Sequence, residues 1–105
     1  MKHGLEFTVK EKDGQLHTYR QETVTTNSLI EWMELTPEKY PDLDQPGWIK
    51  KDAEFIAKLY NDKKITKNFL LEHINSWDWD DFVSKTQLQL IGADPKKVEP
   101  AEEKE

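Results

Sequence analysis

The chain has 105 residues, with 15 Lys or Arg against 21 Asp or Glu, so its formal net charge is -6. An acidic chain repels phosphate groups, which argues against a nucleic-acid-binding protein, and the lack of cysteine excludes disulfides and thiolate chemistry. No apolar stretch approaches the roughly 20 residues that cross a bilayer, so we expect no membrane contact. The polar N-terminus lacks the apolar segment of a signal peptide and predicts a cytoplasmic protein.

The first predicted element is a β-hairpin at residues 5–24. Apolar and polar residues alternate along its first half, which is the period of a half-buried strand. A two-residue turn would place Arg20 opposite Phe7. A three-residue loop ending in Gly14 instead pairs Phe7 with Tyr19 and lets opposite charges face each other on the other side of the hairpin. We therefore predict the three-residue loop, with Gly14 in the left-handed region.

Four helices are predicted to follow, at about 28–35, 48–61, 66–74 and 77–91. The cluster Thr25-Thr26-Asn27-Ser28 holds the N-cap candidates of the first, among which Ser28 has capping-box spacing to Glu31. Thr66 and Ser76 are the predicted N-caps of two others, because each hydroxyl can accept from a free backbone amide of the first turn. Gly92 follows the last helix where a left-handed residue commonly ends one.

These elements define the expected architecture. The sequence predicts an α+β, mostly α, single domain over residues 1–92, in which an N-terminal β-hairpin precedes a small bundle of about four helices. Residues 93–105 are mostly Lys and Glu with two prolines, and we expect them to form a disordered, charged C-terminal tail.

The predicted helix 48–61 has an apolar stripe that spans about half its circumference, which is wider than one core contact requires. The stripe either serves a central helix contacted from two sides or includes a docking surface. Asp52 falls inside the stripe. If the helix begins near Trp48, this carboxylate lies in the first turn and can accept from free backbone amides, which we favour over a buried functional carboxylate.

No arrangement of residues points to catalysis, a metal or a cofactor. The three histidines lie on separate elements, and no glycine-rich phosphate loop is present. The carboxylates of Asp78, Asp80 and Asp81 are interpreted as charges that the N-terminus of the last helix favours. We therefore expect a non-enzymatic protein.

The last helix has two apolar faces. One face is predicted to be core and carries Trp79, Phe82, Val83, Thr86 and Leu90. Trp77, Leu88 and Ile91 lie on the opposite side, where they either form an exposed partner-binding patch or cover neighbouring parts of the fold. With Trp48 and Tyr60 from the wide stripe, they are the candidate partner-binding residues.

Several segments follow one another in a recognisable order from residue 26 onward. They are the helix Leu29–Leu35, the helix Asp52–Tyr60, the polar break Asn61–Lys64, the pair Ile65-Thr66 with its short helix, and a last helix that closes on Leu90-Ile91-Gly92. In this order they resemble the tail assembly chaperones of long-tailed bacteriophages and of prophages in Gram-positive bacteria. The family often has phenylalanine-threonine at the pair and acidic residues after it, where this chain has Lys67-Asn68.

The resemblance implies a protein that helps to build a phage tail in the cytoplasm of the bacterial host. Family members keep the tape measure protein soluble and recruit tail tube protein subunits to it, so both are the expected partners. Self-association into a homo-oligomer stays open. An acidic domain with spare apolar surface suits the binding of a helical, apolar client.

A second interpretation from the residues is a small acidic regulatory interaction domain of phage or host, such as a protein-binding inhibitor that mimics nucleic acid. Its carboxylates would gather on one face at phosphate-like spacing. The acidic residues here are dispersed over every segment, which favours the chaperone.

Overall fold

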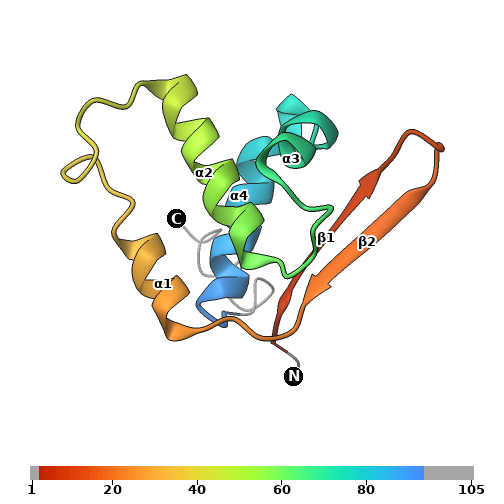
Figure 1. The fold of residues 1–105 in the computed structure, drawn as a ribbon, viewed down its shortest axis with the longest axis horizontal. Coiled ribbons are helices and arrows are strands. Elements are labelled where there is room, and N and C mark those ends of the chain that lie inside the picture. The colour runs from red at the N-terminus through yellow and green to blue at the C-terminus, as the bar shows by residue number, and fades with distance from the viewer. Residues whose placement is uncertain (1–2, 94–105) are drawn as a thin grey trace, which may run out of the picture.

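A computed structural model describes residues 3–93 as a two-stranded antiparallel hairpin followed by four α-helices and one short 3-10 helix (Figure 1). In chain order the elements are β1 (Leu5–Lys10), β2 (Leu16–Gln21), α1 (Thr26–Met33), α2 (Gln45–Leu59), α3 (Lys67–His73), η1 (Ser76–Asp78) and α4 (Trp79–Leu90). The predicted fold class is confirmed. The predicted tail falls on residues 94–105, which lie outside the described residues.

The hairpin has the predicted register. Phe7 pairs with Tyr19 and Glu6 with Arg20 across the two strands. The Phe7 and Tyr19 rings stack with their centres 5.5 Å apart on the inner face, while Arg20 lies 2.5 Å from the Glu6 carboxylate on the outer face. Gly14 has φ +80°, so it supplies the left-handed residue that the loop requires.

The segment between β2 and α1 differs from the prediction at both ends. β2 ends at Gln21, and Val24 packs partly buried against the core instead of continuing the strand. The cap of α1 comes from the predicted cluster of candidates, but it is not Ser28, the candidate with capping-box spacing. Thr25 caps α1, because its hydroxyl accepts from the backbone N–H of Ser28 at 3.3 Å and the earlier start adds helical hydrogen bonds.

α2 begins three residues earlier than predicted. The Asp44 side chain caps it by accepting from the backbone N–H of Gly47 at 2.8 Å. Pro46 stands in the first turn, where its missing N–H has no helical partner to lose. Asp52 consequently lies in the middle of the helix, beyond the free amides of the first turn, so the role predicted for its carboxylate is wrong.

The caps of the last two helices agree with the prediction in part. Thr66 caps α3 as predicted, and Gly92 has φ +79° at the end of α4 as predicted. Ser76 does not cap α4. The chain first makes one tight turn, in which the Asp78 N–H donates to the Asn75 carbonyl at 2.9 Å, and α4 begins only after it.

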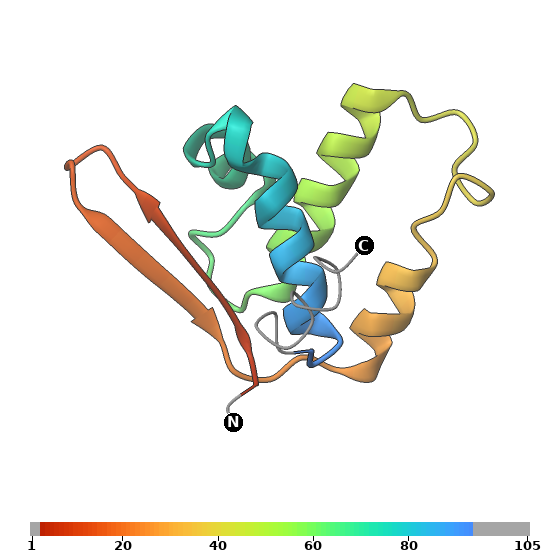
Figure 2. The ribbon, with the colours of Figure 1, turned by 180° about the vertical axis from the view of Figure 1, so that it is seen from behind.

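The core lies between the inner face of the hairpin and helices α2, α3 and α4. Figures 1 and 2 show α2 and α4 at the centre, with the hairpin on one side and α1 on the other. The ring of Phe7 meets Tyr60 at 5.2 Å and Phe82 at 5.5 Å between centres, both edge to face. The predicted core face of the last helix is confirmed, since Phe82 and Thr86 are buried and the other three residues of that face pack against the core.

Candidate protein-binding groove

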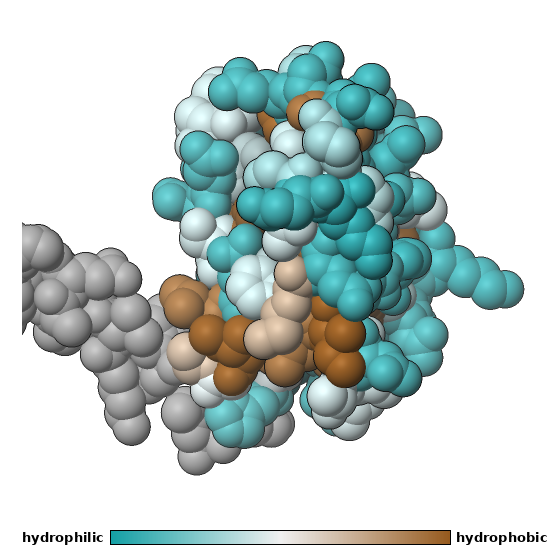
Figure 3. Space-filling view, turned by 90° about the vertical axis from the view of Figure 1, so that its left-hand side faces the viewer, coloured by the Kyte–Doolittle hydropathy of each residue, from teal (hydrophilic) through white to brown (hydrophobic). Residues whose placement is uncertain are grey.

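Helix α1 is the one α-helix of residues 3–93 that has no buried residue. Four of its eight residues are apolar, and none of its residues is buried. Ile30 is 46% exposed and Met33 is 59% exposed. Figure 3 shows hydrophobic residues gathered across the lower part of this side of the molecule, at the height that α1 occupies in Figure 1. An isolated helix of this length is unstable in water, so α1 depends on what it packs against.

Few contacts hold α1 to the rest of the domain. Trp32 and Leu35 pack partly buried against the core. Glu31 forms an ion pair with Lys58 of α2 at 2.6 Å, but both side chains are exposed, and such a pair contributes only about 0–1 kcal/mol. The apolar face of α1 is therefore anchored at one edge and open along the rest.

Two hollows adjoin each other beside α1, because both are lined by Trp48 and Asp52. The first has a volume of about 530 Å³, lies between α1 and α2, and is also lined by Trp32, Met33, Leu35, Thr36, Pro37 and Gln87. The second has a volume of about 630 Å³, lies between α2 and α4, and is also lined by Gln45, Ile49, Trp79, Asp80, Val83 and Ser84. We call this combined surface the α1–α2–α4 groove.

Trp48 is the candidate residue that the structure places in the groove. Its side chain is half-buried, and its ring meets that of Tyr40 edge to face at 6.2 Å. Lys51 places its ammonium 4.6 Å from the centre of the Tyr40 ring. These contacts fix the segment between α1 and α2 against the start of α2 and hold the wall of the groove in place.

Asp52 lies at the centre of the groove. A third, small hollow beneath α1 is also lined by Asp52, together with Phe55 and Val83 among others. Among residues 3–93, the only charged residues that line the three hollows are Asp52 and Asp80. Burial raises the pKa of the Asp52 carboxyl above its ordinary value, because less water remains to stabilise the charge.

The other exposed candidates do not form one patch. Trp77 is 80% exposed on η1, Ile91 is exposed just beyond α4, and Leu88 is half-buried. The 12 residues of α4 separate Trp77 from Ile91, which corresponds to about 18 Å of helix. A shared angle around the helix axis therefore does not bring Trp77 close to Leu88 and Ile91.

Tyr60 belongs to the core and not to the surface. It follows the last residue of α2, is 5% exposed, and turns its ring under Phe7. Its hydroxyl has no hydrogen-bond partner among residues 3–93, and burial raises its pKa. The assignment of Tyr60 as a partner-binding residue is corrected, because the wide stripe of α2 faces the hairpin as well as the groove.

Sequence reasoning missed the part that α1 plays in the site. The Leu-Ile-x-Trp-Met run predicts a helix, and no site residue is predicted on it, although none of its four apolar side chains is fully buried. For Asp52 the available signal was Pro46, whose place in a first turn lengthens α2 and puts Asp52 in the middle of the helix.

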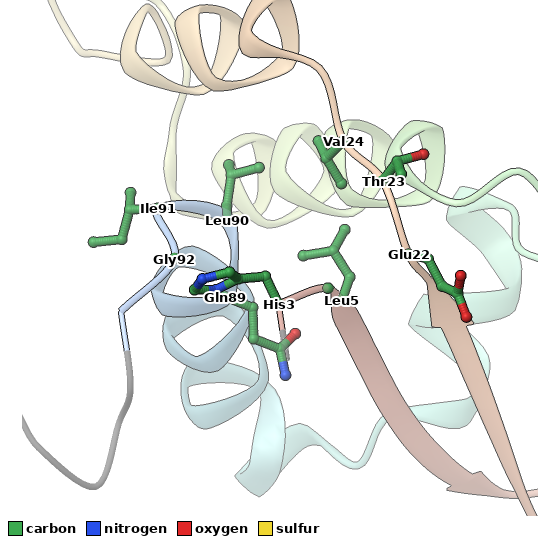
Figure 4. Close-up of a pocket in the computed structure, with 10 residues that line it drawn as sticks. His3, Leu5, Glu22, Thr23, Val24, Gln89, Leu90, Ile91 and Gly92 are labelled. Carbon is green, nitrogen blue, oxygen red and sulfur yellow. The ribbon is translucent and has the colours of Figure 1, made fainter. Parts of the chain in front are cut away.

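A further hollow of about 530 Å³ lies where the start of β1, the segment after β2 and the end of α4 meet (Figure 4). Figure 4 shows His3 beside Gly92, with Glu22 on the far side next to β2. Because both ends of the described chain adjoin this hollow, we assign no ligand to it.

Within residues 3–93, no group of three or more His, Asp or Glu side chains is arranged to hold a metal ion. The helices of this part of the chain are also too short or too polar for any of them to cross a membrane. Comparison of the chain with protein-family models, with curated proteins and with solved structures found no match in any of the three.

Proposed function

We propose that the protein is a phage or prophage tail assembly chaperone, which binds the tape measure protein through the α1–α2–α4 groove and recruits tail tube subunits during tail assembly. The observation that carries the proposal is the open apolar face of α1 beside this groove. A domain with a modest core gains little from leaving such a face in water unless a partner covers it. The order of elements that resembles this family supports the same function.

The shape of the groove favours a helical client. Its walls come from helices, and an amphipathic helix can lay its apolar face between them. Trp32, Trp48 and Trp79 line it with large aromatic surfaces that are only half-buried. Residues of this type often contribute roughly 2–4 kcal/mol each when a partner buries them fully.

The net charge of the chain supports the same role. A chaperone that covers an apolar client must keep the complex in solution, and a formal charge of -6 opposes aggregation of the loaded complexes. Binding energy alone drives such a holding function. The client is protected while it is bound and released when assembly offers it a better partner.

Co-expression with a candidate client tests the proposal. The client is a candidate tape measure protein, and its soluble, co-purifying fraction is measured. Met33→Glu places a charge on the exposed face of α1, and Leu16→Glu is the matched control, because Leu16 is exposed on the hairpin far from the groove. We expect the wild type and Leu16→Glu to keep the client soluble and Met33→Glu to lose it. Failure of the wild type to bind the client, or equal binding by Met33→Glu, would overturn the proposal.

A further inference from the structure

Asp52 is set apart from the other carboxylates of the fold by its neighbours. Its positions one turn away on α2, toward either end, are all apolar, namely Trp48, Ile49, Phe55 and Ile56. Within residues 3–93 its carboxylate takes part in no hydrogen bond and no ion pair. An acid on a surface helix ordinarily faces water or pairs with a base one turn away, whereas Asp52 is only half-exposed and has no base at these positions.

The nearby lysines are directed elsewhere. Lys51 places its ammonium over the Tyr40 ring, and Lys58 pairs with Glu31 of α1. The other charged residue that lines the groove is Asp80 of α4, which has the same sign as Asp52. The walls of the groove are therefore mostly apolar, with Thr36, Gln45, Ser84 and Gln87 as uncharged polar residues, and its charged side chains are negative. No positive side chain lines it in the described part of the chain.

We propose that Asp52 is the ionic anchor of the groove and pairs with a single Lys or Arg that interrupts the apolar face of a client helix. This inference rests on the proposed function, which supplies the helical client. The apolar walls select the helix, and the carboxylate fixes its register, because only one placement along the groove brings the cation to Asp52. A charge pair at a half-buried carboxylate is stronger than the same pair on an open surface.

Burial raises the pKa of Asp52, which agrees with a carboxylate that lacks a partner in the free protein. A client cation would reverse this shift, since a positive charge at hydrogen-bond distance favours the ionised acid. The neighbouring charge of Asp80 adds to the attraction for a cation and disfavours an acidic helix.

Binding of designed peptides to the full chain tests the inference. The probes are amphipathic helical peptides that are identical except at one central position of the apolar face, which is Lys, Gln or Glu, with this position moved along the face by single turns. Each is titrated against the wild type and against Asp52→Asn, which keeps the side-chain shape without the charge. We expect the best Lys peptide to bind the wild type about 10-fold more tightly than its Gln counterpart, and this preference to fall below about 2-fold in Asp52→Asn.

The remaining variants separate the two proposals. Met33→Gln should weaken all peptides alike, because it makes the apolar face of α1 more polar without adding a charge beside the anchor. Equal binding of Lys and Gln peptides by the wild type, or a Lys preference that survives Asp52→Asn, would overturn the anchor and leave the client groove standing. If no peptide binds and the wild type also fails to keep the client soluble on co-expression, both the anchor and the proposed function are contradicted.

Two other occupants would also overturn the inference. If Asp52→Asn changes self-association measured by sedimentation and leaves peptide binding unchanged, the occupant is a second copy of the chain. If a chain ending at Ala93 binds every peptide more tightly and without a Lys preference, the occupant is the chain's own segment 94–105.

Discussion

The backbone of Glu6 and the side-chain amide of Gln89 join the first strand to the last helix across 83 residues of sequence. The Glu6 N–H donates to Gln89 Oε1 at 3.1 Å, and Gln89 Nε2 donates to the Glu6 carbonyl at 3.4 Å. In the part of the chain that the structure describes, the outer edge of β1 has no neighbouring strand, so its backbone groups need other partners. One side chain satisfies both groups of Glu6 and fixes the hairpin against α4.

Replacement of this amide should weaken the fold. Gln89→Leu keeps most of the side-chain volume but leaves the two part-buried backbone groups of Glu6 without partners, which we expect to cost about 1–3 kcal/mol of unfolding free energy. Urea denaturation measures it. Gln15→Leu, at the exposed end of the hairpin, is the control and should change the midpoint little. Equal midpoints for Gln89→Leu and the wild type would contradict the edge contact.

The core prediction concerns Phe82, which links α4 to the hairpin through Phe7. Phe82→Ala leaves a cavity, and we expect a loss of about 3–5 kcal/mol in unfolding free energy. Met33→Ala, on the exposed face of α1, should stay within about 0.5 kcal/mol. A loss below about 1 kcal/mol for Phe82→Ala would show that its ring is not a core element.

The pH dependence of stability should show the cost of the Asp52 charge. Its pKa is raised above the ordinary value of 3.8. The folded state is therefore favoured while the group is protonated, and this stability is lost as the pH rises through the raised pKa. Asp52→Asn should be more stable than the wild type at pH 7, by less than about 1 kcal/mol because water still screens the half-exposed group.

The stability of Asp52→Asn as a function of pH also shows whether the charge of Asp52 is unpaired in the free protein. The advantage of Asp52→Asn should disappear on acidification below pH 3.8, where the wild-type carboxyl is protonated in both states. A mutant that is less stable than the wild type at neutral pH would mean that the charge is already stabilised in the free protein. Asp52 would then be a structural residue.

Glu11 should show the opposite sign. Its carboxylate accepts hydrogen bonds from Lys64 Nζ at 2.8 Å and from the Tyr19 hydroxyl. Both hydrogen bonds lower the pKa of Glu11 below the ordinary 4.5, and the one from Lys64 has the larger effect. The stability it contributes is present above pH 4.5 and is lost as the pH falls through the lowered pKa. The melting temperature of Glu11→Gln should therefore fall less on acidification than that of the wild type. Parallel melting curves over this range would contradict the contribution of Glu11.

The hairpin could be predicted from the sequence in residue-level detail. Strand alternation is strictly local, and a loop that ends in Gly14 leaves only one register in which Phe7 meets Tyr19. The start of α2 could not be predicted in the same way. Pro46-Gly47 is typical of a turn, yet with Asp44 as a cap the same residues open a helix.

The groove could not be predicted from the hydrophobic periodicity of the sequence. Its walls come from three helices, and their relative placement is set by tertiary packing. A helical projection gives the angle of a side chain and ignores its height, so it groups Trp77 with Ile91 although α4 separates them. The apolar stripe of α2 likewise does not reveal which half, that of Tyr60 or that of Trp48, meets the hairpin.

The most direct test of the account is amide hydrogen exchange of the full chain with and without the co-purified client. We predict that client binding slows exchange most in α1 and in the half of α2 that carries Trp48 and Asp52, because the client covers the open face of α1. Exchange in the outer half of the hairpin should be unchanged. Unchanged exchange in α1 together with slowed exchange in the hairpin or around Trp77 would contradict the account.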